Sequence, residues 1–285
     1  MPLVPTFDIA ELVALPDHPV ILRNHRPALK CEMLRELLAA VGFPRLSGYR
    51  DGRVYDYADM EAAEVLAAFT AGRLRLGIAS SYVTPEADPD DALTVPPLVD
   101  DGNLFNLHKE SCGFRKSLVI TQSGGYSRMH VDSYGMAGWM YLFRGRKVWN
   151  LWEHSFAPLF YNLTDEWYFD DAVGDAHPDA RCRALLDSLP RWDGEIGPGE
   201  MLWFPEGWLH RVWTLEDAFG YGGSSLHAAR LEQAVGSWLW ERRLGFSRDF
   251  DYPGLLQDAA AHGFDTERHI KMIDDTITIW RKNGA

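Results

Sequence analysis

The stretch SRMHVDSYGMAGWMYLFRGRKVWNLW, residues 127–152, decides how the rest of the chain is interpreted. It places His130 and Asp132 two residues apart and runs through apolar and aromatic residues to Lys147. Residues two apart in a β-strand point to the same face, so His130 and Asp132 can offer a nitrogen and an oxygen to one ion. The tripeptide alone is weak evidence, because a surface or capping pair has the same letters.

A third ligand has to come from elsewhere in the chain. His210, in FPEGWLHRV, is the best candidate because it also follows a glycine turn and a strand. An antiparallel neighbouring strand would bring it opposite His130 and Asp132. Two histidines and one carboxylate on one octahedral face are typical of non-haem Fe(II) oxygenases.

Lys147 fits a second requirement of such chemistry. We expect it to follow a turn at Arg144-Gly145-Arg146, on a strand beside that of His130, and to share its face with Trp149 and Leu151. A buried lysine needs an anionic partner, and the far carboxylate of a metal-bound 2-oxo acid would be one. The alternative is a solvated lysine in a basic hairpin.

Composition limits the classes of protein to consider. The chain has 285 residues, 46% of them hydrophobic, which predicts a single compact domain over residues 1–285. Its formal net charge of −13, without a run of Lys or Arg, argues against nucleic-acid and membrane binding. The three cysteines are too few and too widely spaced for a disulfide framework or a thiolate zinc site. With no signal-like start or long apolar run, we expect a cytoplasmic protein.

The middle of the chain has a β texture. From Ser117 onward, short segments separated by glycine-containing turns are typical of an all-β barrel or sandwich. We therefore predict a β core over residues 103–235, with an insert at 154–190 that contains a short helix at 181–189. The predicted strands cover residues 117–122, 129–135, 139–145 and 146–152, two more within 197–215, and a last one near 224–232.

Both ends of the chain predict flanking elements. Residues 1–102 are expected to be α/β, with helical patterns at 7–15, 31–42 and 60–72, a strand at 19–24, a D-G turn within 49–57 and a loop at 84–101. Residues 236–285 are expected to be helical, with helices at 233–246 and 266–284. The last helix carries Ile270, Ile273, Ile277 and Trp280 on one face. That face could pack against the core or join two copies in a homodimer.

Two motifs taken together resemble a known family. The pattern H-V-D-x-x-G-x-x-x-W-x-x-L-x-x-G-x-K-x-W-x-L, followed by G-E-M-L-W-F-P-x-G-W-x-H, is similar to JmjC, or cupin-8-like, Fe(II)- and 2-oxoglutarate-dependent oxygenases. It resembles most the branch with factor-inhibiting-HIF-like and JMJD6-like hydroxylases. The resemblance covers roughly residues 117–231. It implies a double-stranded β-helix, that is, a jelly-roll or cupin barrel, with N-terminal α/β elements and a C-terminal helical tail.

The resemblance also implies residue roles. His130, Asp132 and His210 would be the iron ligands, and Lys147 would hold the far carboxylate of 2-oxoglutarate. Ser127 stands where the family often has a Thr that contacts the same carboxylate. The implied cofactors are Fe(II), 2-oxoglutarate and O2.

The chain departs from the family beside the co-substrate. Met140 stands where relatives often carry an Asn, and a glycine-rich piece after His210 lacks the usual late Asn; Ser224, Ser225 or His227 could replace it. The aspartate ligand, rather than a glutamate, favours a hydroxylase over a histone demethylase.

The substrate is less well defined by the sequence. The expected reaction is hydroxylation of an aliphatic C–H in an amino-acid side chain of a peptide or protein, or in a small amino-acid-like metabolite. An N-methyl demethylase and a non-catalytic cupin binding module are the alternatives. Acidic residues of the insert would favour a cationic substrate, or would simply be solvated; they are Asp165, Glu166, Asp170 and Asp171.

Overall fold

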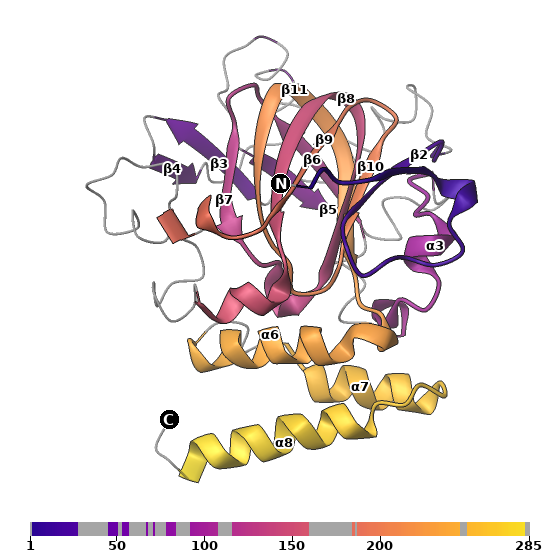
Figure 1. The fold of residues 1–285 in the computed structure, drawn as a ribbon, viewed down its shortest axis with the longest axis vertical. Coiled ribbons are helices and arrows are strands. Elements are labelled where there is room, and N and C mark those ends of the chain that lie inside the picture. The colour runs from indigo at the N-terminus through magenta and orange to yellow at the C-terminus, as the bar shows by residue number, and fades with distance from the viewer. Residues whose placement is uncertain are drawn as a thin grey trace.

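The structure, a computed structural model, shows a large β-sheet with three helices beneath it (Figure 1). It describes residues 2–27, 45–50, 53–56, 67, 71, 78–83, 92–107, 116–159, 184–185, 187–245 and 250–282. The helix predicted at 31–42, all of the helix predicted at 60–72 except residues 67 and 71, residues 84–91 of the predicted loop and most of the insert lie outside the described residues. Among the described helices, none is long and apolar enough to cross a membrane.

Two long antiparallel strands form the spine of the sheet. They are β8 (Ala137–Trp152) and β11 (Leu209–Ser225), and they pair along nearly their whole lengths. Along β8, the first half pairs with β10 (Met201–Phe204) and the second half with β9 (Trp192–Ile196). On the other side, the first half of β11 pairs with β7 (Tyr126–His130) and its second half with β6 (Ser117–Thr121).

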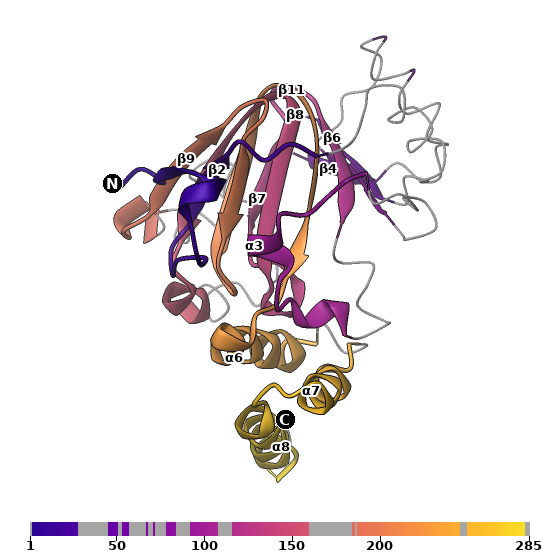
Figure 2. The ribbon, with the colours of Figure 1, turned by 90° about the vertical axis from the view of Figure 1, so that its right-hand side faces the viewer.

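Because each long strand changes its neighbour part-way, the sheet forks into two arms. One arm contains β10 and β6, and the other contains β9 and β7. Apolar side chains from both arms meet in one buried cluster; they include Met140, Leu142, Trp149, Leu151, Leu202, Phe204 and Val212. Figure 2 shows the strands converging at one end and spreading apart at the other, above α6. The predicted mainly-β, cupin-like architecture with flanking helices is confirmed.

The outer strands extend the first arm. β2 (Val20–Arg23) pairs with β10, and β1 (Thr6–Asp8) runs parallel to β2. On the far side, β5 (Ile78–Tyr82) pairs with β6 and is followed by β3 (Arg45–Arg50) and β4 (Arg53–Asp56). The pairings among the described strands leave this sheet open, with β1 and β4 at its two ends.

Four expectations for the N-terminal part can be compared with the structure. The strand predicted at 19–24 is confirmed as β2, and the strand-like pieces on either side of the predicted D-G turn are confirmed as the antiparallel pair β3 and β4, whereas Asp51 and Gly52 themselves lie outside the described residues. The helical pattern at 7–15 is wrong: β1 pairs there with β2, and only a 3-10 turn, η1 (Ile9–Glu11), follows. The end of the predicted loop at 84–101 forms a short helix, α3 (Pro97–Asp100).

The turn predicted at Arg144-Gly145-Arg146 is wrong, because β8 runs through it without a break. Gly145 has a φ of +84°, and a Cβ at this position would lie 2.5 Å from the Cα of Ala218 on β11. The pairing with β11 shifts register around this point, which marks a bulge. The bulge changes which alternate residues face the interior: Gly138, Met140 and Leu142 before it, and Lys147, Trp149 and Leu151 after it.

The remaining strand predictions are mixed. The strands at 117–122 and within 197–215 are confirmed as β6, β10 and the start of β11. The separate strand near 224–232 is wrong, since β11 itself reaches Ser225 and is followed by η6 (Ala228–Arg230). Strand β9 was not predicted. In the helix predicted at 181–189, the described residues 184–185 and 187–188 are helical.

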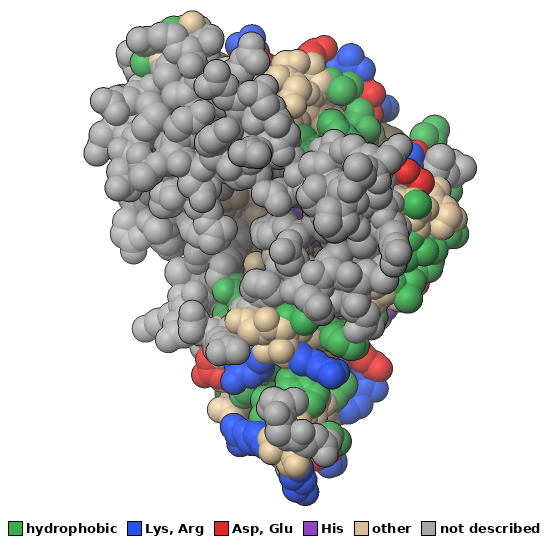
Figure 3. Space-filling model, turned by 90° about the vertical axis from the view of Figure 1, so that its left-hand side faces the viewer, with side chains coloured by type: hydrophobic (Ala, Val, Ile, Leu, Met, Phe, Trp, Pro, Cys, Tyr) green, Lys and Arg blue, Asp and Glu red, His purple; other side chains and the backbone are tan. Residues whose placement is uncertain are grey.

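Three helices end the chain: α6 (Leu231–Arg243), α7 (Tyr252–Ala261) and α8 (Glu267–Lys282). The first and last were predicted. Helix α7 was missed, although Asp251 before Pro253 is a typical helix start. The face of α8 with Ile273 packs into an apolar cluster with α6 and α7, as the packing interpretation requires. Over these helices, Figure 3 shows charges of both signs mixed with apolar groups. A homodimer through them stays a prediction.

Candidate metal centre

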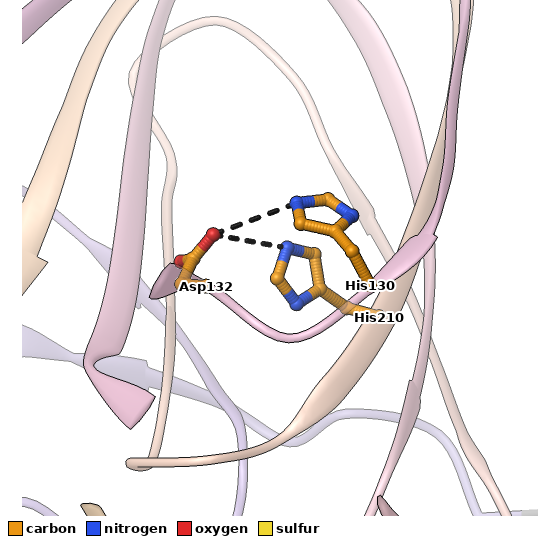
Figure 4. A group of neighbouring side chains, drawn as sticks. All are labelled: His130, Asp132 and His210. Carbon is orange, nitrogen blue, oxygen red and sulfur yellow. Dashed lines mark ion pairs between the residues drawn. The ribbon is translucent and has the colours of Figure 1, made fainter. Parts of the chain in front are cut away.

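The structure brings His130, Asp132 and His210 together, although His210 is 80 residues away from His130 in sequence. One ligand atom of each lies within 4.8 Å of the other two. The Nε2 atoms of His130 and His210 lie 3.5 and 3.7 Å from Oδ1 of Asp132. Figure 4 shows both imidazole rings directed at the carboxylate. Within the described residues this is the only such group of potential metal ligands.

Strand pairing places the two histidines. His130 ends β7 and lies opposite His210 on β11, so the predicted antiparallel juxtaposition is observed. The prediction that Asp132 shares a strand with His130 is wrong. The strand stops at His130, and Asp132 begins the 3-10 turn η4 (Ser133–Gly135). A change of chain direction, and not strand alternation, therefore brings the carboxylate to the histidines.

His210 is oriented by a backbone contact. Its Nδ1 lies 3.2 Å from the carbonyl oxygen of Trp208, which favours a proton on Nδ1 and leaves the lone pair on Nε2 facing Asp132. Burial, and secondarily His130, lower the pKa of His210 to about 4. The ring is therefore neutral at pH 7, as a metal-binding imidazole must be.

Asp132 is ready to bind a cation. Burial opposes ionisation of its carboxyl, but the neighbouring His210 and His130 outweigh that effect and lower its pKa. Its side chain also has close neighbours across the fork. A Cβ on Gly138 of β8 would lie 2.6 Å from Oδ2 of Asp132 and 2.1 Å from the ring of Phe204. Only glycine leaves room there for both groups.

The geometry fits a metal ion held on one face. Separations of 3.5 and 3.7 Å are longer than those of good hydrogen bonds. Ligands at right angles around an ion, with bonds of about 2.1 Å, would lie roughly 3 Å apart. A small inward movement of the side chains would reach that value. The donor set of two imidazoles and one carboxylate suits Fe(II) and leaves coordination positions open.

Lys147 lies on the same inward face of the fork. Lys147 pairs with Thr214 across the β8–β11 ladder. Leu151, four residues further along β8, pairs with His210. Its strand neighbours β11 and not β7, so the expectation that it adjoins the His130 strand is wrong. The side chain is 3% exposed, and burial lowers its pKa to about 7. Among the described residues, none forms an ion pair or hydrogen bond with it.

Two further polar groups on the inward side of the fork are buried without a described partner. One is the indole N–H of Trp149, whose ring lies 5.7 Å from that of His210. The other is the hydroxyl of Thr121, which lies opposite Ala218 on the same inward side. From the sequence, Trp149 was expected on the same face as Lys147, and Thr121 was missed. The position of Thr121 at the end of the strand SLVIT, with its alternating pattern, was the only sequence feature that could have indicated an inward-facing hydroxyl.

A second bulge determines where Ser127 lies. His210 pairs with His130, but Val212 pairs with Ser127, so β7 has one extra residue between these pairs. Ser127 and His130 therefore share a face although they are three residues apart. That placement agrees with the expected role of Ser127 beside the co-substrate, which stays a prediction.

The structure also separates the candidates for the missing Asn. Ser224 lies opposite Gly138 on the inward face, whereas Ser225 lies opposite Ala137 and points away from the fork. His227 is engaged by Glu206 at 3.0 Å and by the carbonyl of Val99 at 3.1 Å. Ser224 is therefore the best placed of the three.

Comparison with known families adds to this geometry. The model of the cupin-like domain matches residues 45–238, about two thirds of the chain, and this range includes His130, Asp132, Lys147 and His210. The chain belongs to the cupin-like family. The match covers all the strands that build the fork, from β3 to β11.

Curated relatives of this cupin-like protein include three with JmjC or demethylase names. A JmjC domain-containing histone demethylation protein 1 of Caenorhabditis elegans is 24% identical over 159 residues, 54% of this chain. Lysine-specific demethylase 2B of Mus musculus is 27% identical over 142 residues, and histone lysine demethylase PHF8 of Danio rerio is 26% identical over 150, covering 49% and 50% of this chain. The matches span only 10–13% of the relatives' own lengths.

These relatives confirm the JmjC resemblance of the cupin-like protein. Fe(II), 2-oxoglutarate and O2 are the cofactors of the JmjC oxygenases in this family, and the histidine–aspartate–histidine group matches that chemistry. The comparisons do not distinguish hydroxylation from demethylation.

Proposed function

We propose that this cupin-like protein is an Fe(II)- and 2-oxoglutarate-dependent oxygenase. One observation carries the proposal: His130, Asp132 and His210, from three separate elements, converge with their ligand atoms within 4.8 Å. When bound, Fe(II) with 2-oxoglutarate and O2 supplies the oxidising power to functionalise an unactivated C–H bond. The residues of the chain provide the binding, the orientation and the dry surroundings.

Lys147 is proposed to bind the distal carboxylate of 2-oxoglutarate. With a strand rise of about 3.3 Å per residue, Lys147 is about 13 Å along β8 from Leu151, which lies opposite His210. An extended dicarboxylate and a lysine side chain can bridge that span. A buried ammonium without a partner is costly, and a bound carboxylate would compensate it. Trp149 and Thr121 offer further donors on the same side, and Ser127 is the fourth candidate.

Apolar walls would keep water away from the reacting groups. The rings of Phe204 and Trp149 lie 4.5 and 5.7 Å from that of His210, and both side chains are buried. A site that excludes water strengthens the electrostatic contacts inside it and limits side reactions.

The proposed reaction is hydroxylation of an aliphatic C–H in an amino-acid side chain, either in a peptide or protein or in a small amino-acid-like metabolite. Removal of an N-methyl group is the second candidate, since the relatives' names include histone and lysine-specific demethylases. The two reactions share the same first chemical event and differ in the substrate carbon. Demethylation would release formaldehyde, whereas hydroxylation of a C–H without a neighbouring nitrogen would not.

The proposal is tested by anaerobic titration of the purified chain with Fe(II) and then 2-oxoglutarate. We expect a weak visible charge-transfer band from the chelate, absent in His130→Ala and weakened in Lys147→Ala. A chain that binds neither compound would instead be a non-catalytic cupin binding module, and the oxygenase proposal would be wrong.

The substrate class is tested by succinate and formaldehyde release together. Peptides with methylated lysine, the same peptides without methyl groups, and free amino acids form the three arms. Succinate with formaldehyde from methylated peptides alone supports demethylation, and succinate without formaldehyde from unmethylated compounds supports hydroxylation.

A further inference from the structure

The metal-binding carboxylate of Asp132 lies at a position where an aspartate usually has another role. Asp132 is the N-cap residue of η4, with the extended backbone (φ −60°, ψ 138°) of a helix start. An aspartate at this position normally accepts hydrogen bonds from the amides two and three residues later. In η4 these are the amides of Tyr134 and Gly135. The side chain of Asp132 makes no such bond, and Oδ1 faces the two histidines instead.

Another carboxylate occupies those two amides. Oε2 of Glu241, on α6, accepts from the N–H of Tyr134 at 2.8 Å, and Oε1 accepts from the N–H of Gly135 at 3.1 Å. Glu241 is completely buried. A buried carboxylate that accepts two backbone bonds is strongly held, because each bond to an ionised acceptor is about twice as strong as a neutral one.

The same turn is held from other sides. Tyr134 has a φ of +66°, which is unusual for a residue with a side chain. Its ring stacks on Phe250 at 4.3 Å, and the hydroxyl of Tyr252 donates to its carbonyl at 3.3 Å. These contacts come from the C-terminal part of the chain, so α6 and the start of α7 support the segment that follows Asp132.

We propose that Glu241 is a positioning residue that caps η4 in place of Asp132 and so leaves the Asp132 carboxylate for the metal. Without Glu241, the amide of Tyr134 loses its acceptor and that of Gly135 keeps only its bond to the backbone carbonyl of Asp132 at 3.1 Å, while the side chain of Asp132 stands at the N-cap position of the same turn. Rotation of its side chain onto these amides would satisfy the turn and remove one metal ligand. The C-terminal helices then contribute to the metal site although they carry none of its ligands.

This inference rests on the proposed function, because it needs a metal at Asp132. The test is an anaerobic titration of the full chain with Co(II) alone, followed by its visible absorption, in the wild type, in three variants of α6 and in the ligand variant His210→Ala. Glu241→Ala removes both acceptor oxygens and Glu241→Gln keeps one. The matched control is Glu232→Gln, which makes the same change of charge on the same helix at an exposed residue that pairs with Arg268.

We expect Co(II) affinity to fall roughly 10- to 100-fold in Glu241→Ala, by a smaller factor in Glu241→Gln, and not at all in Glu232→Gln. The absorption should also change shape in both Glu241 variants, since loss of a carboxylate alters the coordination geometry. A merely structural role would lower the melting temperature and leave both readings unchanged at temperatures well below it. If Glu241→Ala does not fold, Glu241→Gln carries the test.

The outcomes separate the two proposals. A wild type that binds no Co(II) at these residues, judged against His210→Ala, would contradict the proposed function. A wild type that binds Co(II), with folded Glu241 variants of equal affinity and spectrum, would overturn the positioning role alone. Hydrogen exchange gives a check without metal: the amides of Tyr134 and Gly135 should exchange faster in Glu241→Gln than in Glu232→Gln.

Discussion

Lys147 and Glu241 are both buried charged residues, but their surroundings differ. Glu241 accepts two backbone hydrogen bonds that hold η4, whereas Lys147 forms no ion pair or hydrogen bond with any residue in the described part of the chain. A buried charge with partners is part of the fold. A buried charge without partners destabilises the fold, and its pKa shifts in the direction that favours the neutral form. For Lys147 this means a lowered pKa. This difference is consistent with the proposal that Lys147 binds the co-substrate, whereas Glu241 supports the architecture of the site.

The largest expected effect is on the affinity for 2-oxoglutarate when the side chain of Lys147 is removed. Lys147→Ala should weaken 2-oxoglutarate binding roughly 100-fold, since losing one partner of a buried charge pair costs about 2–5 kcal/mol. Metal affinity should stay the same, because Lys147 is not among the metal-binding group. Isothermal titration with Mn(II) and then 2-oxoglutarate measures both. Equal 2-oxoglutarate affinity in the variant and the wild type would show that the anion binds elsewhere.

Stability should respond in opposite directions at the two residues. Lys147→Met should stabilise the ligand-free protein at pH 7 by a few kcal/mol, because an unpartnered buried ammonium is replaced by an apolar side chain of similar length. Glu241→Gln should destabilise it by about 1–3 kcal/mol, since one backbone amide loses its acceptor. Urea denaturation of the two variants and the wild type measures the free energies of unfolding. A loss of stability in Lys147→Met would mean that Lys147 has a structural partner.

The pH dependence of co-substrate binding follows from the pKa of Lys147. That pKa is lowered to about 7 from 10.5, so Lys147 loses its proton as the pH rises through 7 in the ligand-free protein. Binding of a dianion should therefore weaken between about pH 7 and 9 and be accompanied by proton uptake. In Lys147→Arg the side chain stays charged, and any binding that remains should be nearly independent of pH over this range. Calorimetry in buffers of different ionisation enthalpy detects the proton uptake.

The lowered pKa of Lys147 also makes the stability of the folded protein depend on pH. Between about pH 7 and 10.5 the unfolded chain holds a proton on Lys147 that the folded chain lacks, so this residue makes stability rise with pH in that window. Below about pH 7, Lys147 is charged in the folded and the unfolded chain, and the full destabilisation by the buried charge is present. Denaturation at pH 7 and pH 9 should show the rise in the wild type relative to Lys147→Met. Parallel curves for the two proteins would contradict the lowered pKa.

The smallest expected effect concerns the space around Asp132. In Gly138→Ala the new methyl group would meet both Phe204 and Oδ2 of Asp132, so either the ring or the carboxylate has to move. We expect about a 10-fold loss of Co(II) affinity, comparable to that of other residues that support ligands. Gly236→Ala, where the structure shows open space around the new Cβ, is the matched control. Unchanged affinity in Gly138→Ala would mean that Phe204 moves instead of Asp132.

Several features of the site were predictable because they depend on residue type and local pattern. Histidine, aspartate and lysine are recognisable donors, and the glycine turn before MLWFP with the strand before His210 indicated an antiparallel neighbour. Strands β2, β6 and β10 and helices α6 and α8 were readable from alternation or helical spacing. Helix α7 and strand β9 were missed, the former despite its Asp-Tyr-Pro start.

The wrong predictions concern positions where a bulge or a long-range contact overrides alternation. In the sequence, Gly145 predicts a turn. In the structure it lies against Ala218 within the unbroken strand β8, where the pairing with β11 is bulged. The extra residue in β7 is a different case, because it puts Ser127 and His130 on one face, and the expected role of Ser127 stays a prediction. Strict alternation would separate them, because neighbouring residues of an unbroken strand point to opposite faces.

By itself, the sequence determined which groups can take part in the chemistry and roughly which segments are strands and helices, because both follow from residue type and short-range spacing. Only the tertiary structure decided that His210 meets His130, that Lys147 is buried without a partner in the described residues, and that Glu241 takes over the capping role of Asp132. The hydrogen bonds among these relations join residues up to 107 positions apart. They depend on strand register and helix packing, which the pattern around each residue does not contain.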